Sequence, residues 1–213
     1  MSRPKLVLLV IAWVVLIGFG VKYLMIAAGE RAVQERLRSR ATKQAEVATV
    51  ELMKRMKTQL QSAMKDGEPA AAMEVCQAVA QSMTIEYSAE IGDGFSIYRT
   101  ALKLRNPANK PNSDELAWME TTAQYSTGES PIAPYDKVIT NDDYDRELLY
   151  WTPIYVAPVC LTCHGGTEQI PDDVEVLLGV RYPDDAAIDF VVGDFRGIVG
   201  VKVNLDHWTP PQD

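Results

Sequence analysis

The chain has 213 residues with a formal net charge of -8, and 47% of its residues are hydrophobic. This length suffices for one domain with a substantial core and an additional segment, but hardly for two full domains. An acidic chain is poorly suited to nucleic acid, because phosphate binding needs a basic surface. The sequence contains no internal repeat, which argues against a solenoid or a propeller.

The amino-terminal segment is much more apolar than the rest of the chain. Residues 6–28 are apolar except for Lys22, and at about 1.5 Å per residue such a helix can cross a bilayer core of about 30 Å. We therefore predict a transmembrane anchor over residues 6–28, after a cytoplasmic tip of residues 1–5. A cleaved signal peptide is the alternative. Basic residues are more numerous after the span than before it, which by itself would leave the body of the protein in the cytoplasm.

Two helices are predicted after the anchor. Within residues 29–67, apolar side chains recur at spacings of three and four, with charged side chains between them. This pattern predicts a long amphipathic helix over residues 30–65, continuous with the anchor. A second helix is predicted over residues 69–83, because Pro69 suits a first helical turn. The two helices would form a hairpin.

The remaining elements alternate strands with short helices. Residues 95–104 are rich in β-branched and aromatic side chains, which predicts a strand. Asn112 and Glu115 have the spacing of a capping box at the start of a short helix. The other expected elements are a hairpin of strands 135–140 and 147–156, a short helix within 171–182 and a final strand at 197–205. We therefore predict an α+β fold with an antiparallel sheet and short helices, preceded by the long helices and the anchor.

The segment VCLTCHGGT at residues 159–167 brings together Cys160, Cys163 and His164, although the chain has only three cysteines and two histidines. The spacing C-x-x-C-H is the attachment signature of c-type haem. The two thiols form thioethers with the haem vinyl groups, and the adjacent imidazole binds the iron. We therefore predict one covalent haem c, with His164 as the proximal ligand.

Three other interpretations of this segment are a zinc site, a reactive dithiol and a disulfide. A zinc site would need a set such as Cys160, Cys163, His164 and His207, but zinc ligands usually come as two separated pairs. A thioredoxin-type dithiol expects a βαβ setting, and a simple disulfide leaves His164 without a role. Haem remains the favoured interpretation. Because haem is attached in this way outside the cytoplasm, we predict a single-pass protein of the bacterial inner membrane with residues 30–213 in the periplasm.

Four segments occur in an order that resembles a known family. They are AMEVCQAVA, RTALKLRNPANKPN, TPIYVAPVCLTCHGG and RYPDDAAIDFVVGDFRGIVGVKV. On these, residues 70–204 resemble the c-type haem PAS-like sensor domain family, formerly a domain of unknown function. The resemblance implies a PAS-like fold, with the domain at residues 68–207 and a tail at 208–213. One departure is Ile188-Asp189, where a glycine is expected before Phe190.

The sixth position on the iron has several candidate ligands. The resemblance implies that the cysteine of its E-V-C segment, Cys76, binds the distal side. Cys76 is also the remaining thiol and lies on a helix face expected to be buried, although a small core residue is the plain alternative. His207, Met73 and Met83 are further candidates.

Two arginines are candidates for contacts with the haem propionates. Arg105 lies in the segment RNP and Arg196 in GDFRG, and a guanidinium offers paired donors to a carboxylate. Fixing these loops is an equally good role for both residues.

A haem held by histidine and cysteine favours a sensor function, because axial ligand identity is a main determinant of haem behaviour. Loss of the thiolate on reduction would open a site for a gas and release the helix that carries Cys76. The alternative is a membrane-tethered monohaem electron carrier. An enzyme is not expected, because no acid–base or nucleophilic constellation is present. The expected partners are the membrane, a redox or signalling protein, or a second copy of the chain.

Overall fold

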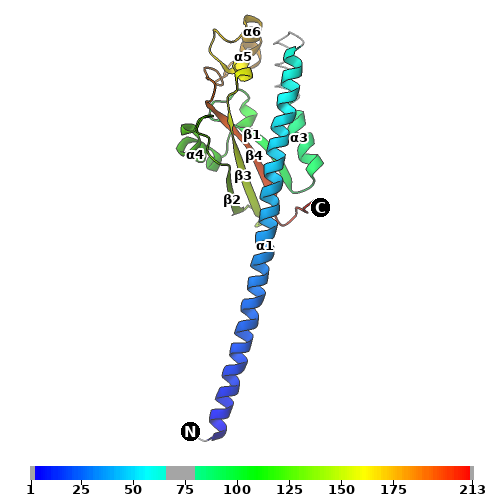
Figure 1. Cartoon of the computed structure of the whole chain (residues 1–213), viewed down its shortest axis with the longest axis vertical. Coiled ribbons are helices and arrows are strands. Elements are labelled where there is room, and N and C mark those ends of the chain that lie inside the picture. Colours follow the sequence, from blue (N-terminus) through cyan, green and yellow to red (C-terminus); the bar gives the residue numbers. More distant parts are fainter. Residues whose placement is uncertain (1–2, 66–79, 212–213) are drawn as a thin grey trace. The chain divides into compact units, whose positions relative to one another are not determined.

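The computed structural model describes residues 3–65 and 80–211 of the chain (Figure 1). The chain divides into two compact units, residues 1–40 and residues 41–213. In the first unit, residues 3–40 are helical. Among the residues that are described, no helix combines the length and the apolar character needed to cross a membrane. This finding does not support the transmembrane anchor predicted over residues 6–28.

Helix α1 spans Arg3–Lys65, which confirms the helix predicted over residues 30–65. In the second unit it buries a stripe of small side chains, because Ala41, Ala45 and Ala48 are all 0% exposed. Spacings of four and three place these residues on one side of the helix. Thr49 beside them lies 3.4 Å from the hydroxyl of Thr152, measured between the two Oγ1 atoms. Small residues here let the helix backbone lie close to the sheet.

The sheet has four antiparallel strands in the order β1-β4-β3-β2. Their bounds are Phe95–Thr100 for β1, Tyr135–Thr140 for β2, Arg146–Tyr155 for β3 and Phe195–Asn204 for β4. The predicted α+β class, the antiparallel sheet and the β2–β3 hairpin are confirmed. The strand predicted over residues 95–104 is too long, because residues 101–104 leave the ladder after Thr100.

Short helices precede the first strand and connect the others. Their bounds are Ala80–Ile91 for α3, Ser113–Thr121 for α4, Leu161–His164 for α5 and Asp172–Arg181 for α6, with 3-10 turns η2 at Pro107–Asn109, η3 at Ala123–Tyr125 and η4 at Pro158–Cys160. Of the helix predicted over residues 69–83, only residues 80–83 are described; they are helical, and α3 continues to Ile91. Arg55 holds α3 against α1, since its Nη1 lies 3.0 Å from Glu90 Oε2 and its guanidinium lies over the Tyr87 ring.

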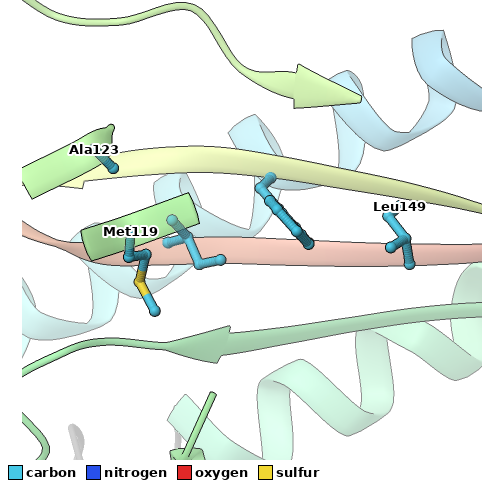
Figure 2. Packing of buried hydrophobic residues seen from close by; sticks show 5 residues of the cluster. Met119, Ala123 and Leu149 are labelled. Atoms are coloured by element: carbon cyan, nitrogen blue, oxygen red, sulfur yellow. The ribbon is translucent and has the colours of Figure 1, made fainter. Parts of the chain in front are cut away.

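Both faces of the sheet are covered, because alternate side chains of a strand point to opposite faces. Val199, Val201 and Val203 of β4 lie on the same face as Thr152, which contacts α1. The opposite face carries the core cluster of α4, which consists of Met119, Ala123, Leu149, Trp151 and Ile198. Figure 2 shows Met119, Ala123 and Leu149 within this cluster. A continuous core on both faces leaves the ends of the strands as the place for a cavity.

The predicted capping box at the start of α4 is confirmed. Asn112 accepts a hydrogen bond from the Glu115 N–H, and Glu115 accepts one from the Asn112 N–H. Glu115 is only 3% exposed and also accepts a hydrogen bond from the hydroxyl group of Tyr98. Burial, followed by the contact with Glu115, raises the pKa of Tyr98, so this hydroxyl stays protonated as a donor. The Tyr98 ring lies over Gly200, where an added Cβ would come within 2.3 Å of it.

The loop before β4 contains a residue in the left-handed region. Asp189 has a φ of 59°, and it stands where the family pattern leads us to expect a glycine before Phe190. The two facts agree, because glycine adopts this conformation without steric cost and aspartate tolerates it better than most residues. The turn is fixed by hydrogen bonds from Asp189 N to Gly165 O and from Phe190 N to His164 O, each 3.0 Å long.

Replacing Glu115 tests the buried contact between β1 and α4. We expect Glu115→Ala to lower the free energy of unfolding by about 2 kcal/mol, because the part-buried Tyr98 hydroxyl loses its acceptor and the Asn112 N–H loses its cap. Asp114→Ala removes an exposed carboxylate from the same helical turn and should cost about 0.5 kcal/mol or less. Urea unfolding of both variants measures the difference. Equal losses would show that the Tyr98–Glu115 contact contributes nothing.

Replacing Asp189 tests the left-handed turn. We expect Asp189→Val to lower the free energy of unfolding by about 2 kcal/mol, because a β-branched side chain clashes with the backbone at positive φ. Asp189→Gly should stay within about 1 kcal/mol of the parent protein. Thermal unfolding of the two variants measures this contrast. A valine variant as stable as the glycine variant would contradict a left-handed turn at this position.

Candidate functional site

Cys160, Cys163 and His164 lie on one short helical segment. Pro158 begins η4, Cys160 ends it, and α5 follows directly from Leu161 to His164. Residues separated by three and four positions share one side of a helix, so this segment directs the two sulfur atoms and the imidazole to the same side. Gly165 ends the helix with a hydrogen bond of 2.9 Å from its N–H to Leu161 O.

The two cysteines are packed in different apolar surroundings. Cys163 is 7% exposed and lies in a cluster with Ile170, Val174 and Leu178, the last two of which belong to α6. Cys160 is half-buried, packs against the cluster of Val156, Ala187 and Phe190, and accepts a hydrogen bond of 3.4 Å from Ala157 N. No disulfide joins Cys160 to Cys163.

The imidazole of His164 is held with one nitrogen engaged. Its Nδ1 lies 2.6 Å from the backbone oxygen of Ala187. Because a carbonyl oxygen can only accept, Nδ1 carries the proton, and the lone pair of the neutral ring is on Nε2. Burial, and then the positive charges of Arg196 and Arg105, lower the pKa of His164 to about 3. The ring is therefore neutral at physiological pH, which is the form that binds a metal.

Arg105 joins three segments around the histidine. Its Nε donates to Asp185 Oδ2 at 2.8 Å, and its Nη2 donates to the backbone oxygens of Cys163 and Ala187. The side chains of Arg105 and Asp185 are only 12% and 9% exposed. The contacts that the structure gives Arg105 are thus those of a residue that fixes loops, which is one of its two predicted roles. Its predicted contact with a propionate stays a prediction.

A cavity of about 310 Å³ lies at the ends of β1 and β3 and the start of β4. All three residues of the C-x-x-C-H motif line it, as do Arg105 and Arg196. Apolar side chains of α1 and α3 contribute further lining: Met53, Met56, Leu60, Met64 and Met83. The cavity falls within the range of small-molecule and cofactor sites, which is about 300 to 1,000 Å³.

The charged lining of the cavity is basic although the protein as a whole is acidic. The charged side chains in the described part of the lining are Lys57, Arg99, Lys103, Arg105 and Arg196. Burial, and next the positive charge of Arg105, lower the pKa of Arg196 to about 10. A half-buried cation of this kind is stabilised by a nearby anion. The cavity is therefore suited to a ligand that combines a large apolar body with negative charge.

Phe190 links the basic side chains to the histidine. Lys103 Nζ lies 4.5 Å and Arg196 Cζ 5.3 Å from the centre of the Phe190 ring. The same ring meets the imidazole of His164 edge-on, at 6.2 Å between ring centres and 88° between planes. Lys103 also donates to Ile188 O at 2.7 Å, and Arg196 donates to Lys103 O at 3.1 Å. The histidine is thus fixed by packing as well as by its hydrogen bond.

The alternative zinc set is not assembled. His207 lies beside Asp145, with 3.1 Å between Nε2 and Oδ2, rather than with the C-x-x-C-H motif. Within the described part of the chain, no three histidine, cysteine or acidic side chains gather closely enough to hold a metal ion.

Of the candidate distal ligands, Met83 lines the cavity, whereas Cys76 and Met73 lie outside the described residues. Met53, Met56 and Met64, and the basic residues Lys57 and Arg99, were missed by the sequence reasoning. Nothing in the sequence marks them, because α1 and the end of β1, which carries Arg99, meet at the cavity only through tertiary packing.

The comparisons with known proteins place the chain in a family. The crystal structure of the cyanobacterial haem-protein Tll0287 is 21% identical in sequence, with a TM-score of 0.49, and covers 76% of this chain and 94% of that chain. No protein with a curated description matches the sequence. The family model for Tll0287-like proteins matches residues 33–204, which is most of the chain and includes every described residue of the site. The chain belongs to the Tll0287-like family.

Proposed function

We propose that this chain carries one haem c, attached through Cys160 and Cys163 and bound at iron by His164. The observation that carries the proposal is that Cys160, Cys163 and His164 line one cavity, while Nδ1 of the imidazole is already engaged by Ala187. A haem-ligating histidine needs this arrangement, because a partner on one nitrogen fixes the ring and leaves the other for the metal. Such a haem supplies one-electron redox chemistry and a place for a diatomic gas.

The remaining lining fits the two ends of a haem. Methionine and leucine side chains from α1 and α3 offer apolar contact to a porphyrin ring. The basic side chains offer donors to propionates, and Arg196 is the best placed of them, because burial and Arg105 already disfavour its charge. A propionate near Arg196 would relieve that cost. Arg105 is a second candidate for such a contact.

The sensor function rests on a change of axial ligand. His164 supplies the proximal ligand, and the resemblance seen in the sequence implies Cys76 for the distal side. Loss of the Cys76 thiolate on reduction would let a gas bind and would bias the helical segments before β1, which is a two-state element of the kind that switches require. The PAS-like character of the domain belongs to this proposal, and so does its location in the periplasm, since covalent haem is attached outside the cytoplasm.

An electron carrier is the second candidate, and the distribution of charge favours it. Residues 165–194, which follow the haem motif directly, contain seven acidic residues besides Asp185, which is paired with Arg105, and one basic residue, Arg181. A surface of one sign close to a haem would steer a basic redox partner toward it. A carrier needs no change of axial ligand, so the two candidate functions differ in a measurable property.

The covalent haem is tested by mass spectrometry and a pyridine haemochrome spectrum of protein made with a haem-attachment system. We expect the mass of the chain plus one haem and the spectrum of a haem with two thioether bonds. Cys160→Ser/Cys163→Ser should lose the covalent haem, because no sulfur remains to bond the vinyl groups. Cys76→Ser is the matched control and should retain it. Bare polypeptide mass for the parent protein would contradict the proposal.

The sensor and carrier functions are separated by optical and magnetic spectra of the ferric, ferrous and CO-treated protein. For a sensor we expect the ferrous iron to lose one axial ligand and to bind CO. We also expect Cys76→Ser to change the ferric spectrum, because axial ligand identity sets the electronic state of the iron. Six ligands in both redox states and no CO adduct would support the carrier instead. If the ferric spectrum of Cys76→Ser were the same as that of the parent protein, Cys76 would be excluded as the distal ligand.

A further inference from the structure

Residue Ala187 is fixed on both sides of its backbone by one buried ion pair. Asp185 Oδ1 accepts from Ala187 N at 2.8 Å, while Asp185 Oδ2 accepts from Arg105 Nε at 2.8 Å. Arg105 Nη2 then donates to Ala187 O at 3.3 Å and also to Cys163 O. The Arg105–Asp185 pair therefore closes a ring of hydrogen bonds around Ala187 and ties it to the helix that carries the C-x-x-C-H motif.

The Ala187 carbonyl is shared between this ion pair and the histidine. Its oxygen accepts from Arg105 Nη2 and from His164 Nδ1, the latter at 2.6 Å. A carbonyl oxygen has two lone pairs and can accept both donors. A cationic donor draws electron density from the carbonyl, so the oxygen is a weaker acceptor toward the second donor than it would be alone.

The strength of the bond at Nδ1 controls how electron-rich the imidazole is. A strong acceptor pulls the Nδ1 proton away from the ring and raises the basicity of Nε2 toward a metal. An electron-rich axial ligand stabilises the ferric state, and a positive charge nearby stabilises the ferrous state. The Arg105 cation stabilises the ferrous state in both ways: it makes the imidazole less electron-rich, and it places a positive charge near the iron.

We propose that Arg105 is a positioning residue that donates to the Ala187 carbonyl beside His164 Nδ1, weakens this carbonyl as an acceptor for the histidine, and thereby raises the reduction potential of the haem. This inference rests on the proposed binding of haem by His164. The role differs from a propionate contact, because it acts on the proximal histidine through the backbone of Ala187. Asp185 supports this role of Arg105, because one of its oxygens orients Arg105 and the other accepts from the Ala187 N–H.

The test removes the charges of the pair and follows the histidine directly. The variant Arg105→Gln/Asp185→Asn keeps polar side chains but removes both charges, so no unpaired charge stays buried. We expect a stronger bond from His164 Nδ1 to Ala187 O. The Nδ1 proton resonance of His164 is measured by NMR in the reduced protein and should move downfield. Where the reduced iron is five-coordinate, CO is added to make it diamagnetic. The ferric-to-ferrous equilibrium should shift about tenfold toward ferric, which is 59 mV for one electron.

Arg105→Lys provides the second variant, for the case in which the double variant does not fold. Lysine keeps the charge beside Asp185 but lacks the planar fork that reaches two carbonyl oxygens. We expect its Nδ1 resonance to move in the same direction by a smaller amount.

The matched control is Arg146→Gln/Asp206→Asn. This pair has the same chemistry, with hydrogen bonds from the Arg146 guanidinium to both carboxylate oxygens of Asp206, but it joins the start of β3 to the residues after β4. It should leave the resonance and the potential unchanged.

The outcomes separate this inference from the proposed haem function. A pyridine haemochrome spectrum is recorded first for every variant. Absence of covalent haem in the parent protein would overturn the proposed function. With haem attached in the parent and in a variant at Arg105, the role of Arg105 alone would be overturned if the Nδ1 resonance and the potential stayed unchanged or moved in the opposite directions. A shift of equal size in the control pair would overturn it as well.

Discussion

The hydrogen bond from His164 Nδ1 to the carbonyl of Ala187 is the contact on which the site depends. It decides the tautomer of the imidazole, because a carbonyl oxygen accepts and never donates. Burial keeps the ring neutral, and the edge of Phe190 fixes its plane. Without this bond the histidine would have no defined metal-binding nitrogen. The other parts of the site hold the two ends of this hydrogen bond in place.

The loop of residues 185–190 supplies one of these ends and is itself unusually constrained. Asp189 adopts a left-handed conformation, and its N–H and that of Phe190 return to the residues that end α5. Asp185 and Arg105 fix Ala187 from the other side. A loop with so many contacts loses little further entropy when a ligand is bound. The site is therefore organised in advance, rather than formed around its ligand.

The charge of the site is opposite to that of the chain. The net charge of -8 makes the protein acidic as a whole, whereas Arg105 and Arg196, both half-buried, line the cavity. Partial burial disfavours the charge of Arg196 and lowers its pKa. A cation of this kind beside a cavity suits the binding of an anion or the tuning of a nearby group. The proposed contact of Arg196 with a propionate is the first of these roles, and the proposed effect of Arg105 on His164 is the second.

The sequence alone determined the local features of this protein. The spacing of Cys160, Cys163 and His164 places them on one helical side, and the cap formed by Asn112 and Glu115 follows from contacts three residues apart. Periodicity likewise predicted the long helix and the antiparallel strands. Local spacing is enough in these cases, because backbone geometry over a few residues fixes which side chains meet.

Only the tertiary structure decided which distant residues complete the site. Arg105 reaches Cys163 across 58 positions and Asp185 across 80, and the methionines of α1 join the cavity although they lie some hundred positions before the motif. The partner of His164 is a backbone carbonyl, which any residue at position 187 would provide, so the sequence carries no sign of it. Contacts of this kind depend on how the helices and the loop pack at the end of the sheet, and packing is a property of the whole fold.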